Sequence, residues 1–113
     1  MVGQLLEIYP LMTQRTGRLE KRIPLTVPVQ LEGLVLPPTV ETTKTENVSS
    51  LGVRTVSTQS WQTEQQLRLT LLQGGQRRLF KVIYCHSLSS GKFAVGLQLL
   101  GPPIHWPGRS IGD

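Results

Sequence analysis

Two short stretches of the sequence carry side chains suited to binding an anion, and the first is a basic run at residues 15–22. Four of its eight residues are cationic: Arg15, Arg18, Lys21 and Arg22. A guanidinium stays charged, and its planar fork donates paired hydrogen bonds to a phosphate or to the edge of a base. Because Pro24 follows and the residue before proline disfavours helix, we interpret the run as a flexible basic arm. A solvated charged tail is the alternative.

The second stretch is residues 47–52, Asn-Val-Ser-Ser-Leu-Gly, between two segments that have strand patterns. Asn47 offers amide donors and an acceptor, and Ser49 offers a hydroxyl. Gly52 permits backbone conformations that other residues resist. The same residues also describe an ordinary turn, because Asn and Ser side chains often bond to their own backbone there.

The composition argues against an enzyme. The chain has seven acidic residues, and its only aspartate is Asp113, so there is little material for carboxylate catalysis. The single cysteine, Cys85, excludes an internal disulfide and a multi-cysteine metal site. His86 and His105 have no metal-ligating neighbour at the usual spacing, and neither a nucleophile elbow nor a glycine-rich phosphate loop is present. We therefore predict no catalytic residue, no metal and no cofactor.

Charge and hydropathy indicate the kind of partner and compartment. The formal net charge is +5, which favours an anionic partner, and its concentration in one arm favours a compact anion over a long polyanion. Residues 1–12 lack the basic start of a signal peptide, and no apolar run approaches the roughly 20 residues of a membrane helix. With one cysteine, the chain suits a reducing compartment, and we expect a cytoplasmic protein without a membrane span.

The elements that must position these residues are short strands, because apolar and polar residues alternate along most of the chain. Residues 23–31 place Leu25, Val27, Val29 and Leu31 on one face, with Pro28 marking an edge or a bulge. The other predicted strands are residues 39–47, 53–57, 66–72, 77–85 and 93–100. In the fifth of the six strands, Leu79 and residues 82–84 form the expected apolar part.

Six short strands without a long helix predict an all-β barrel or sandwich. Closure into a barrel would also remove exposed strand edges. Gly74 and Gly75 mark a hairpin turn, and Trp61 and Trp106, each beside a turn, are expected to pack inside. We divide the chain into an N-terminal segment with the basic arm (1–22), a β-barrel (23–101) and a coil tail (102–113).

The order and spacing of these residues resemble the PilZ domain family. The resemblance covers roughly residues 15–100 and is carried by four motifs: Arg18-x-x-x-Arg22, Val27-x-Val29, Asn47-x-Ser49-x-x-Gly52 and Gly91-x-x-x-Val95-Gly96-Leu-x-Leu99. Each motif alone is a weak pattern, whereas the ordered set with matching strands is fairly specific.

The resemblance implies a six-stranded antiparallel barrel that binds the bacterial second messenger cyclic di-GMP and acts as a non-enzymatic receptor or adaptor. Arg18 and Arg22 would then reach guanine edges and phosphates, and Asn47 and Ser49 a guanine edge and the sugar-phosphate. Gly52 would keep the face clear. The secondary candidates are Arg15, Arg54 and Gly96.

Two other functions stay open at the level of sequence. A PilZ-like barrel can serve as a protein-interaction adaptor without a ligand, which the retained arginines and residues 47–52 argue against. A small barrel can also bind RNA, but that function needs exposed aromatic side chains on a basic face, and this chain has few aromatic residues. The protein partner that would receive the signal is not identified by any motif.

Overall fold

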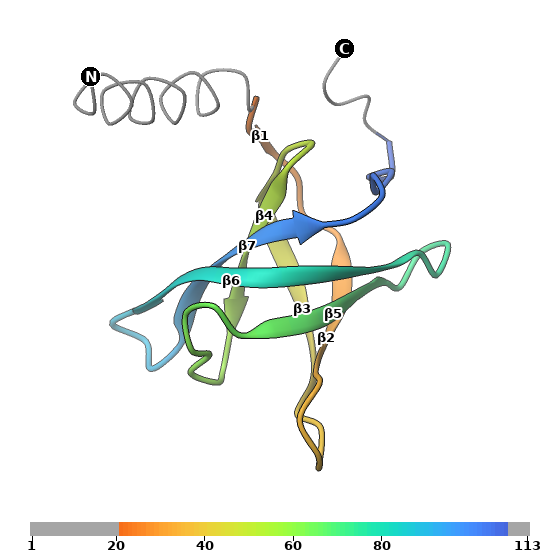
Figure 1. Ribbon diagram of the computed structural model, residues 1–113. Coiled ribbons are helices and arrows are strands. Elements are labelled where there is room, and N and C mark those ends of the chain that lie inside the picture. The colour runs from red at the N-terminus through yellow and green to blue at the C-terminus, as the bar shows by residue number, and fades with distance from the viewer. Residues whose placement is uncertain (1–20, 109–113) are drawn as a thin grey trace, which may run out of the picture.

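The computed structural model describes residues 21–108, and every regular element in that part of the chain is a β-strand (Figure 1). The strands are β1 (Ile23–Pro24), β2 (Pro28–Gly33), β3 (Val40–Val48), β4 (Gly52–Ser57), β5 (Gln66–Leu71), β6 (Arg77–Ser87) and β7 (Phe93–Leu100). Five of the six predicted strands are present within one or two residues of the expected bounds. The hairpin predicted at Gly74 and Gly75 joins β5 to β6, and both glycines have positive φ angles.

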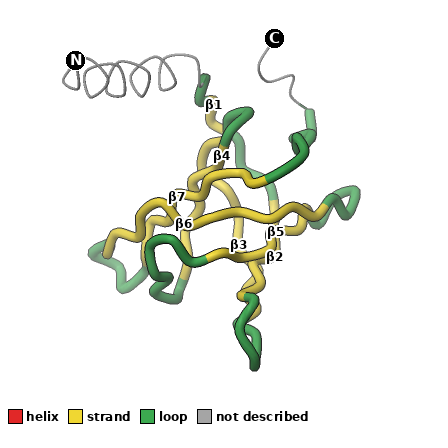
Figure 2. The backbone as a smooth tube through the Cα atoms, viewed as in Figure 1, coloured by secondary structure: helices red, strands yellow, loops and turns green. Residues whose placement is uncertain are grey.

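Six of the strands close into an antiparallel barrel. The sheet order is β1-β3-β2-β5-β6-β7-β4, and β3 pairs with β4 to complete the ring, which confirms the predicted barrel (Figure 2). Strand β1 lies outside the ring, against β3. In Figure 1, β1 and the β3–β4 turn lie at one end of the barrel and the β2–β3 loop at the other.

The prediction of one continuous strand over residues 23–31 was wrong. The segment follows one edge of β3, but it is interrupted between β1 and β2, where the buried side chain of Thr45 enters the ladder. Thr45 Oγ1 accepts a hydrogen bond from Val27 N at 3.0 Å and donates one to Leu25 O at 2.5 Å. The Thr45 hydroxyl thus interrupts the regular ladder between two remaining backbone hydrogen bonds, Leu25 N to Glu46 O at 3.2 Å and Thr45 N to Val27 O at 3.0 Å. The apolar alternation of the segment cannot reveal this.

The core is made by the inward side of the alternating strands. Buried side chains on β2, β5 and β7 include Leu31, Leu69 and Val95, as their period of two predicts. The expected apolar run 82–84 needs a correction: Ile83 is 43% exposed. The register of β6 against β7 shifts between Val82 and Tyr84, so Ile83 is an extra residue on a bulge and leaves the alternation.

The two tryptophans pack inside, as expected. Trp61 and Trp106 are both 4% exposed and belong to the core, together with Ile104. The segment that follows β7 has no regular structure through residue 108, yet it is fastened to the barrel: Gln76 Nε2 donates to His105 O at 2.8 Å, and His105 N donates to Gln76 Oε1 at 3.0 Å. This described part of the predicted coil tail therefore closes one side of the core. Residues 21–108 contain no helix of the length and hydropathy that a membrane crossing requires.

Candidate ligand-binding face

Strand β1 fixes the end of the basic run beside the second motif. Ile23 pairs with Val48 and Pro24 with Asn47. Arg22, the residue before β1, therefore lies beside the end of β3. Arg22 Nη1 donates a hydrogen bond to Asn47 Oδ1 at 3.0 Å. Two residues that are 25 positions apart, one from each predicted motif, are therefore in direct contact. Arg15 and Arg18 lie outside the described residues, so their predicted roles stay predictions.

Ser49 and Gly52 close the β3–β4 turn. Ser49 Oγ accepts hydrogen bonds from Leu51 N at 3.1 Å and Gly52 N at 3.0 Å, and Ser49 N donates to Gly52 O at 2.9 Å. The Ser49 side chain is fully buried, and its carbonyl accepts from Trp106 Nε1 at 3.1 Å. This geometry is the turn that the sequence offered as an alternative. Ser49 shapes the turn next to Asn47, and its direct contact with a ligand stays a prediction.

Four strands bring a row of residues to the outside of the barrel. Asn47 pairs with Arg54, Arg54 with Gly96, and Gly96 with Tyr84. Directly opposite residues in an antiparallel ladder project from the same side of the sheet. Their neighbours along the strands, such as Val53, Val95 and Leu97, are in the core, so this row faces outward. We call the surface made by Arg22, Asn47, Arg54, Gly96 and Tyr84 the arginine face.

Gly96 makes room for an aromatic ring on this face. A Cβ atom at position 96 would lie 2.2 Å from Tyr84 Cε2, so the ring packs directly on the backbone of β7. The φ angle of Gly96 is not in the left-handed region, which means that space and not backbone conformation requires the glycine here. Tyr84 also stacks on His86, with ring centroids 4.6 Å apart.

Arg54 is held between an acid and this tyrosine. Arg54 Nε donates to Glu46 Oε1 at 2.8 Å, and Arg54 Nη1 donates to Tyr84 Oη at 3.3 Å. The guanidinium carbon lies 5.9 Å from the centroid of the Tyr84 ring. The hydrogen bond with Glu46, followed by that with Tyr84, raises the pKa of Arg54.

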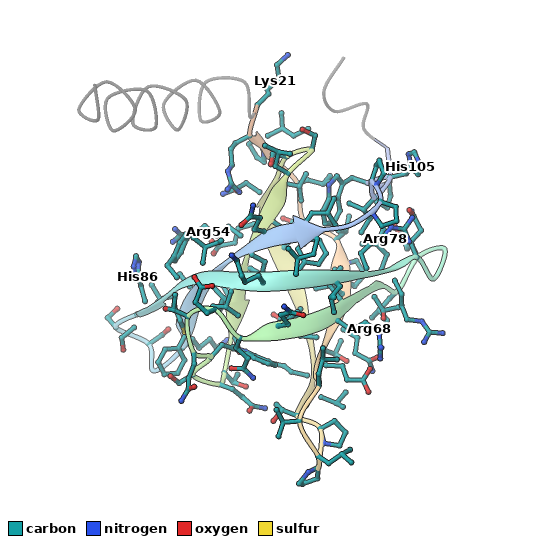
Figure 3. All side chains as sticks on the ribbon, viewed as in Figure 1. Lys21, Arg54, Arg68, Arg78, His86 and His105 are labelled. Carbon is teal, nitrogen blue, oxygen red and sulfur yellow. The ribbon has the colours of Figure 1, made fainter. Side chains whose placement is uncertain are left out.

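A bulge in β3 explains how Glu46 reaches Arg54. The register of β3 against β4 shifts between Thr45 and Asn47, so Glu46 is inserted into the alternation and shares the outer side with Asn47. In Figure 3, Arg54 and His86 lie on one side of the barrel, whereas Arg68, Arg78 and His105 lie on the other. The arginine face thus lies away from Arg68, Arg78 and His105.

Sequence reasoning named Arg54 and Gly96 as secondary candidates but missed Tyr84 and Glu46. A glycine inside a strand signals a close approach by another group, and that signal at Gly96 could have prompted a search for an aromatic partner. The bulge that presents Glu46 has no such signature. Within residues 21–108, no group of three or more His, Cys, Asp or Glu side chains is arranged to hold a metal ion.

No protein-family model and no curated protein matches the sequence. The fold is similar to the solved structure of the Bacillus subtilis inhibitor of motility, MotI/DgrA, with a TM-score of 0.57 and 20% sequence identity. The match covers 71% of this chain and 41% of that one, so the chain spans less than half of that protein's length. At this identity the likeness shows the fold alone, and it supports the PilZ-like barrel that the motifs predicted.

Proposed function

We propose that the protein binds cyclic di-GMP on the arginine face and acts as a non-enzymatic receptor or adaptor in the bacterial cytoplasm. The observation that carries this proposal is the 3.0 Å hydrogen bond between Arg22 Nη1 and Asn47 Oδ1. It joins the last residue of the Arg-x-x-x-Arg motif to the first residue of the Asn-x-Ser-x-x-Gly motif. The two motifs must lie this close together if both are to contact one ligand.

The chemistry of the face suits a guanine dinucleotide. Guanine presents O6 and N7 as paired acceptors, which an arginine fork satisfies, and the two phosphates need cationic donors. One bidentate contact contributes about 1–3 kcal/mol, whereas micromolar affinity needs about 8 kcal/mol. Several groups must therefore act together. Asn47 accepts a hydrogen bond from Arg22 and pairs with Arg54 across the β3–β4 ladder, and Arg18 is expected to join them.

The proposed output is a change of surface rather than a reaction. A dianion bound across β1, β3 and β4 would cover polar groups at the end of the barrel where the β3–β4 turn and β1 lie (Figure 1). A partner protein could then distinguish the bound from the free barrel. The structural neighbour is named as an inhibitor of motility, and a regulatory role of this chain would be in keeping with that name.

Calorimetric titration with cyclic di-GMP tests the proposal. Arg22→Ala should weaken binding about 5- to 150-fold, the equivalent of one bidentate contact of 1–3 kcal/mol, without changing the circular dichroism spectrum. Arg68→Ala is the matched control, because it removes one partly exposed arginine from the opposite side of the barrel and should bind like the wild type.

Three ligands separate the competing functions. Wild-type protein titrated with cyclic di-GMP, GTP and a short single-stranded RNA should bind only the first with high affinity. Wild-type affinity in Arg22→Ala would remove the proposed site. A folded wild-type protein that binds none of the three would favour the ligand-free adaptor, and preference for the RNA would favour the RNA-binding barrel.

A further inference from the structure

A carboxylate covers the guanidinium of Arg54. Its Nε donates to Glu46 Oε1 at 2.8 Å, on the same face where we place a ligand with two phosphates. Both side chains are partly exposed, 36% for Arg54 and 43% for Glu46. Exposed ion pairs of this kind contribute little to stability and are easily exchanged for another partner. The pair therefore leaves Arg54 available to a competing anion.

The other side of the guanidinium has a separate support. Tyr84 Oη accepts from Nη1 at 3.3 Å, and the Tyr84 ring is seated on Gly96, where no side chain competes for the space. Loss of the Glu46 contact would leave this second contact in place. The guanidinium would stay beside the Tyr84 hydroxyl, and its Nε would become free to donate to another acceptor.

We propose that Arg54 is a third anion-binding arginine of the face, that Glu46 covers it in the free protein, and that a ligand phosphate takes the place of the Glu46 carboxylate on binding. This inference rests on the proposed function and adds two residues to it. Glu46 then lowers the affinity for the ligand, since each binding event must displace its carboxylate from Arg54. Tyr84 is a positioning residue that keeps the guanidinium in place during the exchange.

A second reading of Glu46 predicts the opposite result, which makes the inference testable. A carboxylate can accept hydrogen bonds from the N–H groups of a guanine edge, and in that case Glu46 would contribute to binding. Neutralising Glu46 strengthens binding if the carboxylate competes with the ligand and weakens it if the carboxylate contacts the ligand. The sign of one affinity change thus separates the two roles.

The experiment compares Glu46→Gln with Glu32→Gln in titrations with cyclic di-GMP. Glu32 is the matched control, because it also pairs with a partly exposed arginine, Arg68 at 3.4 Å, on another part of the barrel. Glu46→Gln should tighten binding about three- to tenfold at low salt, with a smaller gain at high salt, and Glu32→Gln should leave affinity unchanged. Arg54→Ala should weaken binding about tenfold and should abolish the gain from Glu46→Gln.

Nuclear magnetic resonance of the arginine Nε–H groups gives a readout that stability does not affect. Cyclic di-GMP should shift the Arg54 signal of the wild type and leave that of Arg68 in place. Tyr84→Phe, which keeps the ring and removes the hydroxyl, should broaden or move the Arg54 signal while thermal stability changes little.

Each remaining outcome overturns the inference. If Arg22→Ala loses binding but Glu46→Gln binds like the wild type or more weakly, the covering role of Glu46 is refuted and the proposed function stands. If neither the wild type nor Glu46→Gln binds cyclic di-GMP, the proposed function and this inference are refuted together.

Discussion

Substitution of Gly96 by alanine tests the packing of the arginine face without reference to any ligand. A Cβ atom at position 96 would lie 2.2, 2.5 and 2.6 Å from three atoms of the Tyr84 ring, far inside contact distance. The backbone of β7 is paired on both sides, with β4 and β6, so the ring rather than the strand must move. The ring would leave its seat and lose its hydrogen bond with Arg54.

The expected cost follows from these contacts. Overpacking of a well-filled site costs about 1–3 kcal/mol. The lost hydrogen bond with Arg54 contributes about 0.5–1.5 kcal/mol and is part of that total. Glycine in a strand is about 0.5–1 kcal/mol less favourable than alanine, which offsets some of the loss. We expect a net destabilisation of about 1–2 kcal/mol, which for a chain of this length lowers Tm by about 4–8 °C.

A double-mutant cycle isolates the clash. With Tyr84→Ala as background, Gly96→Ala should be neutral or stabilising by up to about 1 kcal/mol, because the ring is gone and only the gain in strand preference remains. Gly33→Ala is the control, since a Cβ atom there would have its nearest neighbours at 3.6 Å, an ordinary contact distance. Urea unfolding measures the stabilities of the four proteins of the cycle and of Gly33→Ala. Equal effects of Gly96→Ala with and without Tyr84 would refute the packing that we describe.

The remaining predictions concern the side-chain hydrogen bonds of Thr45 and Trp106. Thr45→Val should destabilise the barrel by about 1–3 kcal/mol, because it leaves Val27 N and Leu25 O without their side-chain partner in a buried place; urea unfolding measures the loss, and stability equal to the wild type would show that regular pairing can replace the bridge. Trp106→Phe keeps an aromatic ring but removes the donor to Ser49 O, so it should cost about 0.5–1.5 kcal/mol and increase amide exchange in the β3–β4 turn; unchanged exchange there would mean that Trp106 does not support the turn.

The strands could be predicted from the sequence because burial on one side imposes a period of two. Residues 66–71 alternate Leu67, Leu69 and Leu71 with polar residues, and all three leucines are fully buried. The glycine pair at positions 74 and 75 also predicted a hairpin turn, and both residues adopt positive φ angles in the hairpin between β5 and β6. Local patterns of this kind carry enough information to identify an element.

The candidate site could be predicted only in part. The motif residues Arg22 and Asn47 were named from the sequence, and the structure places them in contact. Glu46 could not be named, because it lies next to Asn47 in a strand and regular alternation would put it on the opposite side. The bulge that brings it to the outer face depends on pairing with β4, which a single strand's sequence does not specify.

The sequence by itself therefore determined five of the six predicted strands and, where the alternation is regular, which side of a strand faces the core. It also named Arg22 and Asn47, which the structure places in contact. Only the tertiary structure decided that β3 meets β4 to close the ring, that Tyr84 rests on Gly96, and that Trp106 supports the turn at Ser49. The physical reason is the range of the interactions involved. The alternation of apolar and polar residues can be seen in any few consecutive residues of a strand. Barrel closure, bulges and the packing of Tyr84 on Gly96 depend instead on pairing between residues that are far apart in sequence.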